Sequence, residues 1–451
     1  MASTQKKTVE LGNSMFAAWL RLCQAKANGE VSGQAYYADQ YFNYIASVLE
    51  AMPDDFVTAD GFNPKGLVRA QIFMRHEPGC LVAGIDLAIA TIVNSLSKDK
   101  RGLLSIEAID DGTWVEYGGS ADLVTPVMNL IGPYEVMAQL ETSILGVLSR
   151  CTRIANHVLE CLNAANGTPV LFFPQRFDSP FDQEMDGYAY YLAVAYYNKQ
   201  YSLNLPVIVS SQAGAALFGK NGKSQGSTPH SLMAIFGGDE QAAMENFAKY
   251  LNPDIKRIFL ADYHNDVISS IKGVAQVYWG HYMTAYLAKD ETEMKRWRLW
   301  GIRIDTSAAL IDRVMSDNAQ TEGGVSPMLV EAVRAFMNRR LPEILVPDGD
   351  SLHRMIAREY CESLSITVTG GFGPSKIERF ENGAGISQWR IPVNAYGVGS
   401  GMLKNDGSYD FTMDVVEAQR NKRWYSVAKV GRAPNFNENL KLVEKDLYLV
   451  D

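Results

Sequence analysis

Ile366-Thr367-Val368-Thr369-Gly370-Gly371 joins a short run of strand-forming residues to a pair of glycines. The same pattern, an apolar run that ends at polar residues or glycine, recurs through the second half of the chain. It recurs at 170–176, 207–212, 258–264, 302–306 and 393–399. Such runs are typical of buried parallel strands, and the stretches between them are long enough for crossover helices. The pattern predicts an α/β barrel whose chemistry lies where the carboxyl ends of the strands converge.

The spacing between these runs is uneven, so the barrel is predicted to be irregular. Before it, helical periodicity gives way to short strand-like pieces and then to a long helical stretch. We therefore expect four segments along the chain. They are an N-terminal helical extension (1–30), an N-terminal α/β domain of α+β character with a linking helix (31–165), the α/β barrel (166–405) and a polar C-terminal segment that ends in an edge element (406–451).

Composition narrows the classes of partner. The 451 residues carry a net charge of -9, which argues against binding to nucleic acid or to an anionic membrane. No apolar stretch approaches the roughly 20 residues that span a bilayer. The N-terminus has no apolar signal core, and the five cysteines form no metal-binding pattern. We expect a cytoplasmic enzyme that acts on small molecules.

Two glycine-containing loops end adjacent runs and predict a phosphate site. Gly370 and Gly371 close one run, and Gly397 and Gly399 close the next. Glycine lets backbone N–H groups approach an anion closely, and the helix expected after Gly371 would favour negative charge at its start. Either loop alone could be only a tight turn. Together they favour phosphate binding.

Charged residues at the strand ends are the candidate catalytic groups. Arg303 and Asp305 are two residues apart on one run, so they share a strand face. Asp262 ends the preceding run. A salt-bridged barrel interior is one interpretation. The other is a cation for substrate phosphates and carboxylates for ribose hydroxyls or Mg²⁺.

His230 lies in a turn-rich segment, Gly226-Ser227-Thr228-Pro229-His230-Ser231. A lone histidine is more often structural, but here hydroxyl groups flank it, and it could exchange a phosphoryl group. Phe173 and Arg176 could hold a flat ring against an aromatic face with a cation near its substituent. The alternative for this pair is a core phenylalanine and a surface arginine.

In this order, the motifs resemble the nicotinate/nicotinamide phosphoribosyltransferase family, most of all its compact archaeal-type nicotinate members. The resemblance extends from about Tyr36 to Arg432. The motifs that carry it are Ala38-Asp39-Gln40-Tyr41-Phe42, Gln139–Gly146, Phe173-Pro174-Gln175-Arg176, Gly226–Ser231 with Gly238-Asp239-Glu240, Ile302–Thr306, Thr369-Gly370-Gly371 and Tyr396–Gly399.

The resemblance implies a type II phosphoribosyltransferase fold, in which C-terminal chain completes the N-terminal domain beside an irregular α/β barrel. The implied reaction converts nicotinate and phosphoribosyl pyrophosphate to nicotinate mononucleotide and pyrophosphate in NAD salvage. ATP hydrolysis usually accompanies it, and Mg²⁺ would enter with the substrate, with Asp305 as a candidate ligand. The implied assembly is a homodimer or a higher homo-oligomer.

The resemblance also implies roles for individual residues. Phe173 would stack on one side of the pyridine ring and Tyr41, from a partner subunit, on the other. Arg176 and Gln212 would face the ring substituent, and His230 matches the histidine that ATP phosphorylates. Asp262 and Asp305 would hold the ribose and Arg303 the pyrophosphate. The 5′-phosphate would be held by Gly370, Gly371, Gly397, Gly399, Lys429 and Arg432.

The chain departs from the family pattern at the base. Phe177 stands where nicotinate members carry a second arginine, and Gln212 is a neutral amide that does not discriminate carboxylate from carboxamide. The N-terminal extension has no family counterpart, and the cysteine-rich knuckle of archaeal-type members is absent. Nicotinamide or another heterocycle, and a non-catalytic role, remain alternatives. A quinolinate-type enzyme needs several cations, and the Arg176 region is poor in them.

Overall fold

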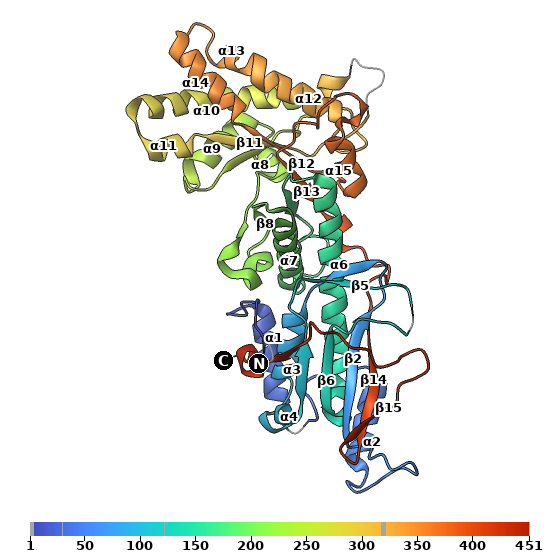
Figure 1. The fold of residues 1–451 in the computed structure, drawn as a ribbon. Helices are drawn as coiled ribbons and strands as arrows, with labels where there is room; N and C mark the ends of the chain where they lie inside the picture. Colours follow the sequence, from blue (N-terminus) through green and yellow to red (C-terminus); the bar gives the residue numbers. More distant parts are fainter. Residues whose placement is uncertain (1–3, 29, 121, 317–321, 451) are drawn as a thin grey trace. The chain divides into compact units, whose positions relative to one another are not determined.

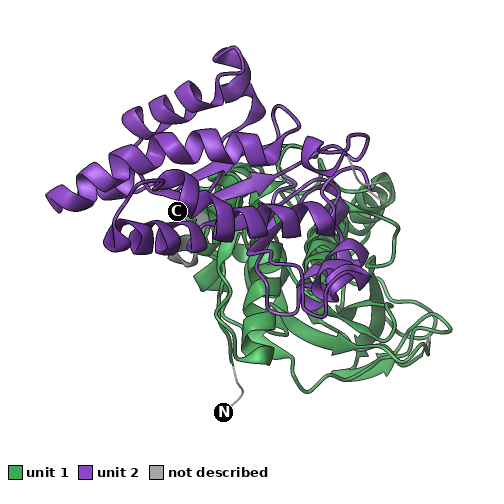
Figure 2. Ribbon diagram, turned by 90° about the horizontal axis from the view of Figure 1, so that it is seen from above, with its two compact units in different colours: residues 1–159, 175–224, 403–451 green, residues 160–174, 225–402 purple. Residues whose placement is uncertain are grey.

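The computed structural model describes residues 4–28, 30–120, 122–316 and 322–450. Its contacts divide the chain into two compact units (Figure 2). Unit 1 comprises residues 1–159, 175–224 and 403–451, and unit 2 comprises residues 160–174 and 225–402.

A seven-stranded sheet forms the centre of unit 1 (Figure 1). The first and second strands in its order are parallel, and the other neighbours for which pairing is described are antiparallel. C-terminal strands pair with N-terminal ones, so the returning chain completes this domain as predicted. The order is β1 (Thr4–Gln5), β16 (Lys441–Val443), β4 (Ser105–Ala108), β6 (Met128–Pro133), β2 (Leu67–Met74), β14 (Phe411–Arg420) and β15 (Arg423–Ser426).

Helices and two short strand pairs complete unit 1. Every residue of α3 is buried. Most of its side chains are apolar, and the buried Asp86 and Asn94 are hydrogen-bonded to other elements. The strand pairs are β3 (Gly79–Val82) with β5 (Thr113–Glu116), and β8 (Val207–Val209) with β9 (Gly222–Ser224). The helices are α1 (Met15–Lys26), α2 (Gln40–Ala51), α3 (Ile85–Asn94), α4 (Lys98–Leu103), α5 (Tyr134–Met137), η1 (Ala138–Leu140), α6 (Glu141–Ala165), α7 (Gln183–Tyr201), η2 (Ala213–Asn221) and η7 (Lys445–Tyr448). The end of α6, from residue 160, belongs to unit 2.

Residues 175–224 are grouped with unit 1 by their contacts. The reason lies in α7, whose acidic first turn binds elements of unit 1. Glu184 accepts hydrogen bonds from the backbone N–H groups of Met15 and Phe16 at 2.9 and 2.8 Å. These bonds also cap α1, so the N-terminal extension is an integral part of unit 1.

Unit 2 is built on a parallel sheet with helices between successive strands (Figure 1). Each of its strands was predicted from an apolar run. Their residues are largely buried, and Ile366 and Val368 are fully so, because helices cover the faces of a parallel sheet. The order is β10 (Arg257–Leu260), β11 (Leu299–Ile304), β12 (Ser365–Val368), β13 (Ala395–Val398) and β7 (Val170–Phe172).

The crossover helices of unit 2 begin at side-chain caps that the sequence supplies. Asp239, Asp266, Ser326 and Asp350 each accept a backbone N–H of the helix that follows. The helices are α8 (His230–Ile235), α9 (Glu240–Tyr250), α10 (Val267–Ala288), α11 (Glu291–Arg296), η3 (Arg313–Met315), α12 (Pro327–Ala335), η4 (Phe336–Arg340), α13 (Leu341–Leu345), α14 (Ser351–Glu362), α15 (Pro374–Glu381), η5 (Gly383–Gly385) and η6 (Ser400–Leu403).

Two further findings bear on the expectations from composition. All five cysteines are buried. Among the described residues, no helix combines the length and the apolar character that a membrane span requires.

Candidate active site

The carboxyl ends of the unit 2 strands gather most of the predicted catalytic and phosphate-binding residues. Arg303 lies in β11 and Asp305 directly follows it, while Gly370 and Gly371 follow the neighbouring β12. Asp262 follows β10 on the other side of β11. Adjacent parallel strands end at one edge, so these residues meet because of the sheet order.

Arg303 and Asp305 form an ion pair at this edge. Arg303 Nη2 donates to Asp305 Oδ2 at 2.8 Å, and Arg303 Nη1 donates to Ser227 Oγ at 2.8 Å. Both charged side chains remain 20% exposed, so the pair reaches the surface of the sheet edge. Buried Arg303 Nε and Thr306 Oγ1 have no hydrogen-bond partner among the described residues. Unpaired polar atoms beside an accessible ion pair suit a polar ligand.

The glycine pair lies against Asp305. Gly370 and Gly371 have φ angles of +88° and +71°, which residues with a side chain rarely adopt. A Cβ at Gly370 would lie 3.3 Å from Asp305 Oδ1, so glycine also leaves room for that carboxylate. A phosphate-sized group at this loop would therefore be next to Asp305.

His230 and Asp262 form a second pair. His230 Nε2 lies 3.1 Å from Asp262 Oδ1, and the histidine is 47% exposed whereas the aspartate is 6% exposed. Burial raises the pKa of Asp262, and the neighbouring His230 opposes this shift. The His230 loop is anchored because Thr228 Oγ1 accepts the Leu260 N–H at 3.0 Å. With Nε2 directed at the carboxylate, Nδ1 is the nitrogen that could bind a phosphoryl group.

Phe173 lies directly against Gly397. The Phe173 N–H donates to the Val398 carbonyl at 2.9 Å, which continues the β7–β13 pairing. A Cβ at Gly397 would lie 2.8 Å from the Phe173 ring and 2.5 Å from Thr369 Cγ2. Gly397 therefore makes room for the ring that was predicted to stack on the base. Gly399 is just beyond β13, and its carbonyl accepts the Met402 N–H at 3.1 Å.

Lys376 was not singled out from the sequence. Its Nζ donates to the Gly370 carbonyl at 3.2 Å and lies 4.3 Å from the centroid of the Phe372 ring. Burial lowers the pKa of Lys376. A lysine in the first turn of the helix that follows a glycine pair is a signal that could have identified it, because that turn faces the loop.

The predicted base-binding residues Arg176 and Gln212 are in unit 1, where Gln183 links their loops. Gln183 Nε2 donates to the Gln175 carbonyl at 3.1 Å, and Gln183 Oε1 accepts from Ser211 Oγ at 2.9 Å. Arg176 is exposed and its guanidinium lies 5.1 Å from the ring centroid of Phe177. The structure thus brings together the neighbours of both predicted residues.

Tyr41, Arg432 and Lys429 are also in unit 1. Tyr41 is 57% exposed, and its hydroxyl donates to Asp39 at 3.2 Å. Arg432 Nε lies 3.5 Å from Asp414 Oδ2. Both aspartates act on Glu141, whose pKa is raised to about 8 by burial and then by Asp414 and Asp39. Tyr41 and Arg432 therefore share an acidic neighbourhood, whereas Lys429 is simply exposed.

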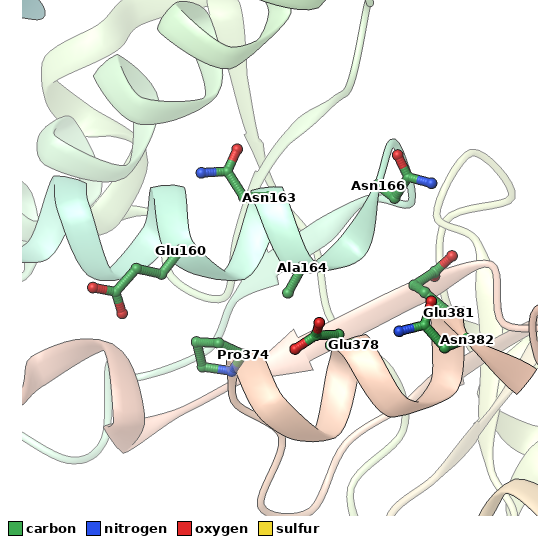
Figure 3. Close-up of a pocket in the computed structure, with 8 residues that line it drawn as sticks. All are labelled: Glu160, Asn163, Ala164, Asn166, Pro374, Glu378, Glu381 and Asn382. Atoms are coloured by element: carbon green, nitrogen blue, oxygen red, sulfur yellow. The ribbon is translucent and has the colours of Figure 1, made fainter. Parts of the chain in front are cut away.

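A pocket of about 600 Å³ in unit 2 contains none of the predicted residues (Figure 3). It lies between the last turn of α6 and α15, and carboxylates and amides line it without a cation. None of the residues described as lining it carries a positive charge that could pair with a phosphate. The lining residues are Glu160, Asn163, Ala164, Asn166, Pro374, Glu378, Glu381 and Asn382.

The Gly238-Asp239-Glu240 motif lines another pocket, of about 530 Å³, at the starts of α9 and α10. His264 Nε2 lies 2.8 Å from the Gly238 carbonyl, which ties this motif to the loop after β10. Burial raises the pKa of Glu240, and its Oε1 has no partner among the described residues. The motif therefore supports the loop that carries Asp262.

The residues present fit Mg²⁺ only as a substrate-held ion. In the described part of the chain, no group of three or more His, Cys, Asp or Glu residues could hold a metal. Mg²⁺ commonly keeps several waters and binds through one or two carboxylates and substrate phosphates. Asp305, exposed beside the glycine loop, could supply such a carboxylate.

Comparisons with known proteins agree with this architecture. The family model described as quinolinate phosphoribosyl transferase, N-terminal domain, matches residues 39–152. No curated protein sequence matches the chain.

Solved structures share the fold over nearly the whole chain. The nicotinate-nucleotide pyrophosphorylase of Pyrococcus furiosus is 20% identical, with a TM-score of 0.55 over 95% of this chain and 82% of that one. Human nicotinic acid phosphoribosyltransferase is 14% identical, with a TM-score of 0.53 over 84% and 74%. NadC from Streptococcus pyogenes is 12% identical, with a TM-score of 0.50 over 90% and 97%. The predicted fold class and the resemblance on which it rested are confirmed at the level of the fold.

Proposed function

We propose that this chain, with its type II phosphoribosyltransferase fold, transfers the phosphoribosyl group of phosphoribosyl pyrophosphate to nicotinate. The products are nicotinate mononucleotide and pyrophosphate, a step of NAD salvage. The observation that carries the proposal is the edge of the unit 2 sheet, where the Arg303–Asp305 pair adjoins the Gly370 loop. A cation, a carboxylate and a glycine loop at one strand edge are the groups that a phosphorylated pentose needs.

These groups suit the chemistry of the transfer. Loss of pyrophosphate from C1 of ribose develops positive charge on the sugar and negative charge on the leaving group. Asp305 and Asp262 can bind ribose hydroxyls and face the developing cation, and Arg303 can neutralise the departing pyrophosphate. The Gly370 loop and Lys376 would hold the 5′-phosphate, so the sugar is aligned at both ends. Mg²⁺ bound with the substrate would neutralise more of the negative charge on the leaving group.

The His230–Asp262 pair supports coupling to ATP. Nδ1 of His230 is the nitrogen that would accept a phosphoryl group, while Asp262 would stabilise the positively charged ring. A negative phosphohistidine beside Arg303 would change the affinity for the sugar pyrophosphate. It would not attack the base.

The base would lie against Phe173, with Arg176 at its carboxylate and Tyr41 of a second subunit on the opposite face. Exposure of Tyr41 leaves its ring available to a partner. The proposal therefore includes a homodimer.

A second candidate is transfer to quinolinate, which the family model matched by residues 39–152 favours. That base carries two carboxylates, and the segment 173–178 offers only Arg176 as a cation, followed by Phe177. The charge of the loop therefore favours the monocarboxylate.

The test is release of pyrophosphate from phosphoribosyl pyrophosphate with nicotinate, quinolinate or nicotinamide as the base. We expect turnover with nicotinate, and we expect Asp305→Ala to lower kcat by about 10²–10³-fold with an unchanged circular dichroism spectrum. Turnover with quinolinate alone would establish the second candidate. Near-normal rates in the variant would remove Asp305 from the site, and no release with any base would reject the proposal.

A further inference from the structure

One arginine of α6 binds three aspartates that lie close together in the chain. Arg150 Nε donates to Asp186 Oδ1 at 2.7 Å, and Arg150 Nη2 donates to Asp186 Oδ2 at 3.0 Å. The same Nη2 donates to Asp178 Oδ2 at 2.8 Å. Asp182 Oδ2 lies 3.7 Å from Nη1. All four residues are in unit 1.

The three aspartates differ in burial, which separates their contributions. Asp186 is 5% exposed and accepts hydrogen bonds from both Nε and Nη2 of Arg150, so this pair anchors α7 to α6. Asp178 is 40% exposed and lies in the loop before α7. The hydrogen bond from Arg150 lowers the pKa of Asp178, so this carboxylate is ionised at neutral pH. Arg150 therefore joins a rigid pair of helices to an accessible loop.

That loop carries Arg176 and Phe177 between two tethers. On one side, the Gln175 carbonyl accepts from Gln183 at 3.1 Å. On the other, Asp178 accepts from Arg150 and its Oδ1 accepts the Ser179 N–H at 2.7 Å. Arg176 has only the adjacent Phe177 ring as a described side-chain contact, so its position depends on how these neighbours are held.

We propose that Arg150 is a positioning residue for recognition of the base: by holding Asp178, it fixes the loop from which Arg176 binds the substituent of the ring. This inference rests on the proposed function, because it deepens the role given there to Arg176. It assigns no chemistry to Arg150 itself. If the loop were free to move, the Arg176 guanidinium would occupy many positions. Fixing it on binding would then cost free energy and weaken its ion pair with the base.

The test uses Asp178→Asn, because Arg150 substitutions would leave Asp186 buried and unpaired. Asparagine keeps an acceptor for the Ser179 N–H and removes only the charge that Arg150 holds. The matched control is Asp54→Asn, which breaks an ion pair of similar length, 2.7 Å to Lys65, elsewhere in unit 1. Asp178→Glu is the conservative variant that should restore the contact.

Two measurements separate a positioning role from a merely structural one. We expect faster hydrogen exchange in the peptide 175–182 of Asp178→Asn, with other peptides unchanged. We also expect the KM for the base to rise about tenfold, since displacing a binding group by the order of 1 Å can cost up to about a hundredfold. The KM for phosphoribosyl pyrophosphate and kcat should stay within about twofold, because a ground-state contact to the base alone is changed.

The outcomes are distinct. A selective rise in the KM for the base, reversed in Asp178→Glu and absent in Asp54→Asn, supports the proposal. Unchanged exchange, or faster exchange with an unchanged KM for the base, overturns it. If the wild-type protein turns over no base, the proposed function fails. The affinity for nicotinate, measured by isothermal titration in both proteins, then decides the inference, and equal affinities overturn it.

Discussion

His230 and Asp262 fix the orientation of a histidine ring whose second nitrogen stays available. Because Nε2 lies 3.1 Å from the carboxylate, Nδ1 is the ring nitrogen that could accept a phosphoryl group. We expect His230→Ala to lose ATP stimulation and acid-labile phosphate incorporation but to keep residual transferase activity. The physical reason is that the Asp305 and glycine groups that bind the sugar are untouched. Radiolabelled phosphate transfer from ATP measures the first effect, and pyrophosphate release measures the second.

His281→Ala is the control for this experiment. His281 is 46% exposed and lies 3.8 Å from Glu245, so it matches His230 in exposure and in having a carboxylate neighbour. It is far from the strand edge along the chain, on α10. Equal phosphate incorporation in His230→Ala and the wild-type protein would discard the phosphohistidine role.

At the residue scale, the sequence predicted a contact between strand residues but missed the contacts of helical side chains. Arg303 and Asp305 pair because alternate residues of a strand share a face, a rule that depends only on spacing. Lys376 and Arg150 were missed, because their partners come from a loop and from separate helices. No local pattern encodes which carbonyl or carboxylate a helical side chain will meet.

The packing of β13 against its neighbours requires a glycine at position 397. As β13 runs beside β7, a Cβ at this glycine would lie 2.8 Å from the Phe173 ring and 2.5 Å from Thr369 Cγ2. We expect Gly397→Ala to displace the ring, to lower stability by about 1–3 kcal/mol and to raise the KM for the base. Thermal unfolding and steady-state kinetics measure the two effects.

Gly373→Ala is the matched control, since no atom lies within 4 Å of a Cβ there. Its φ is -156°, which alanine adopts readily. If both alanine variants behaved alike, the space above Gly397 would not be what holds Phe173 in place.

Glu141 begins α6 and faces carboxylates from two other elements, Asp414 of β14 and Asp39 before α2. Burial first, and these charges second, raise its pKa from 4.5 to about 8. The folded protein therefore holds a proton that the unfolded chain releases above about pH 4.5. The contribution of Glu141 to stability is fully present below that pH and is lost as the pH rises through about 8, a loss of up to a few kcal/mol.

We expect Glu141→Gln to remove this loss. The variant should unfold at a higher temperature than the wild-type protein at pH 9, and the difference should vanish near pH 4. Differential scanning calorimetry across this range measures it. The exposed Glu50→Gln on α2 should follow the wild-type curve, and a pH-independent difference in Glu141→Gln would contradict the assigned proton.

At the scale of the whole molecule, the class of fold followed from the sequence, but the side-chain contacts of residues 175–224 did not. The apolar runs predicted each strand of unit 2, and the family resemblance implied the return of the C-terminal chain. Residues 175–224 are grouped with unit 1, because Glu184 and Asp186 in the first turn of α7 bind the N-terminal extension and Arg150. A charged residue in the sequence does not show which residue it will pair with. The grouping of residues 175–224 with unit 1 therefore required the structure.

Tyr41 belongs to unit 1, and Asp305 belongs to unit 2. Tyr41, Tyr44 and Val48 are exposed along α2, an apolar face that suits contact with a second subunit. If Tyr41 acts across that contact, a heterodimer of Tyr41→Ala and Asp305→Ala holds one intact site and one doubly altered site. We expect it to have about half the wild-type activity per dimer, because a twofold dimer has two equivalent sites.

Two different affinity tags allow this heterodimer to be purified after co-expression, and pyrophosphate release at low nicotinate measures its activity. A heterodimer of Asp305→Ala with the wild-type chain is the control, since it should retain about half the activity wherever Tyr41 acts. If Tyr41 instead serves the site of its own subunit, the double heterodimer has no intact site. Its activity would then fall to that of the Tyr41→Ala protein or below. Such a result would remove the partner subunit from the base site while leaving the roles of Asp305 and His230 unaffected.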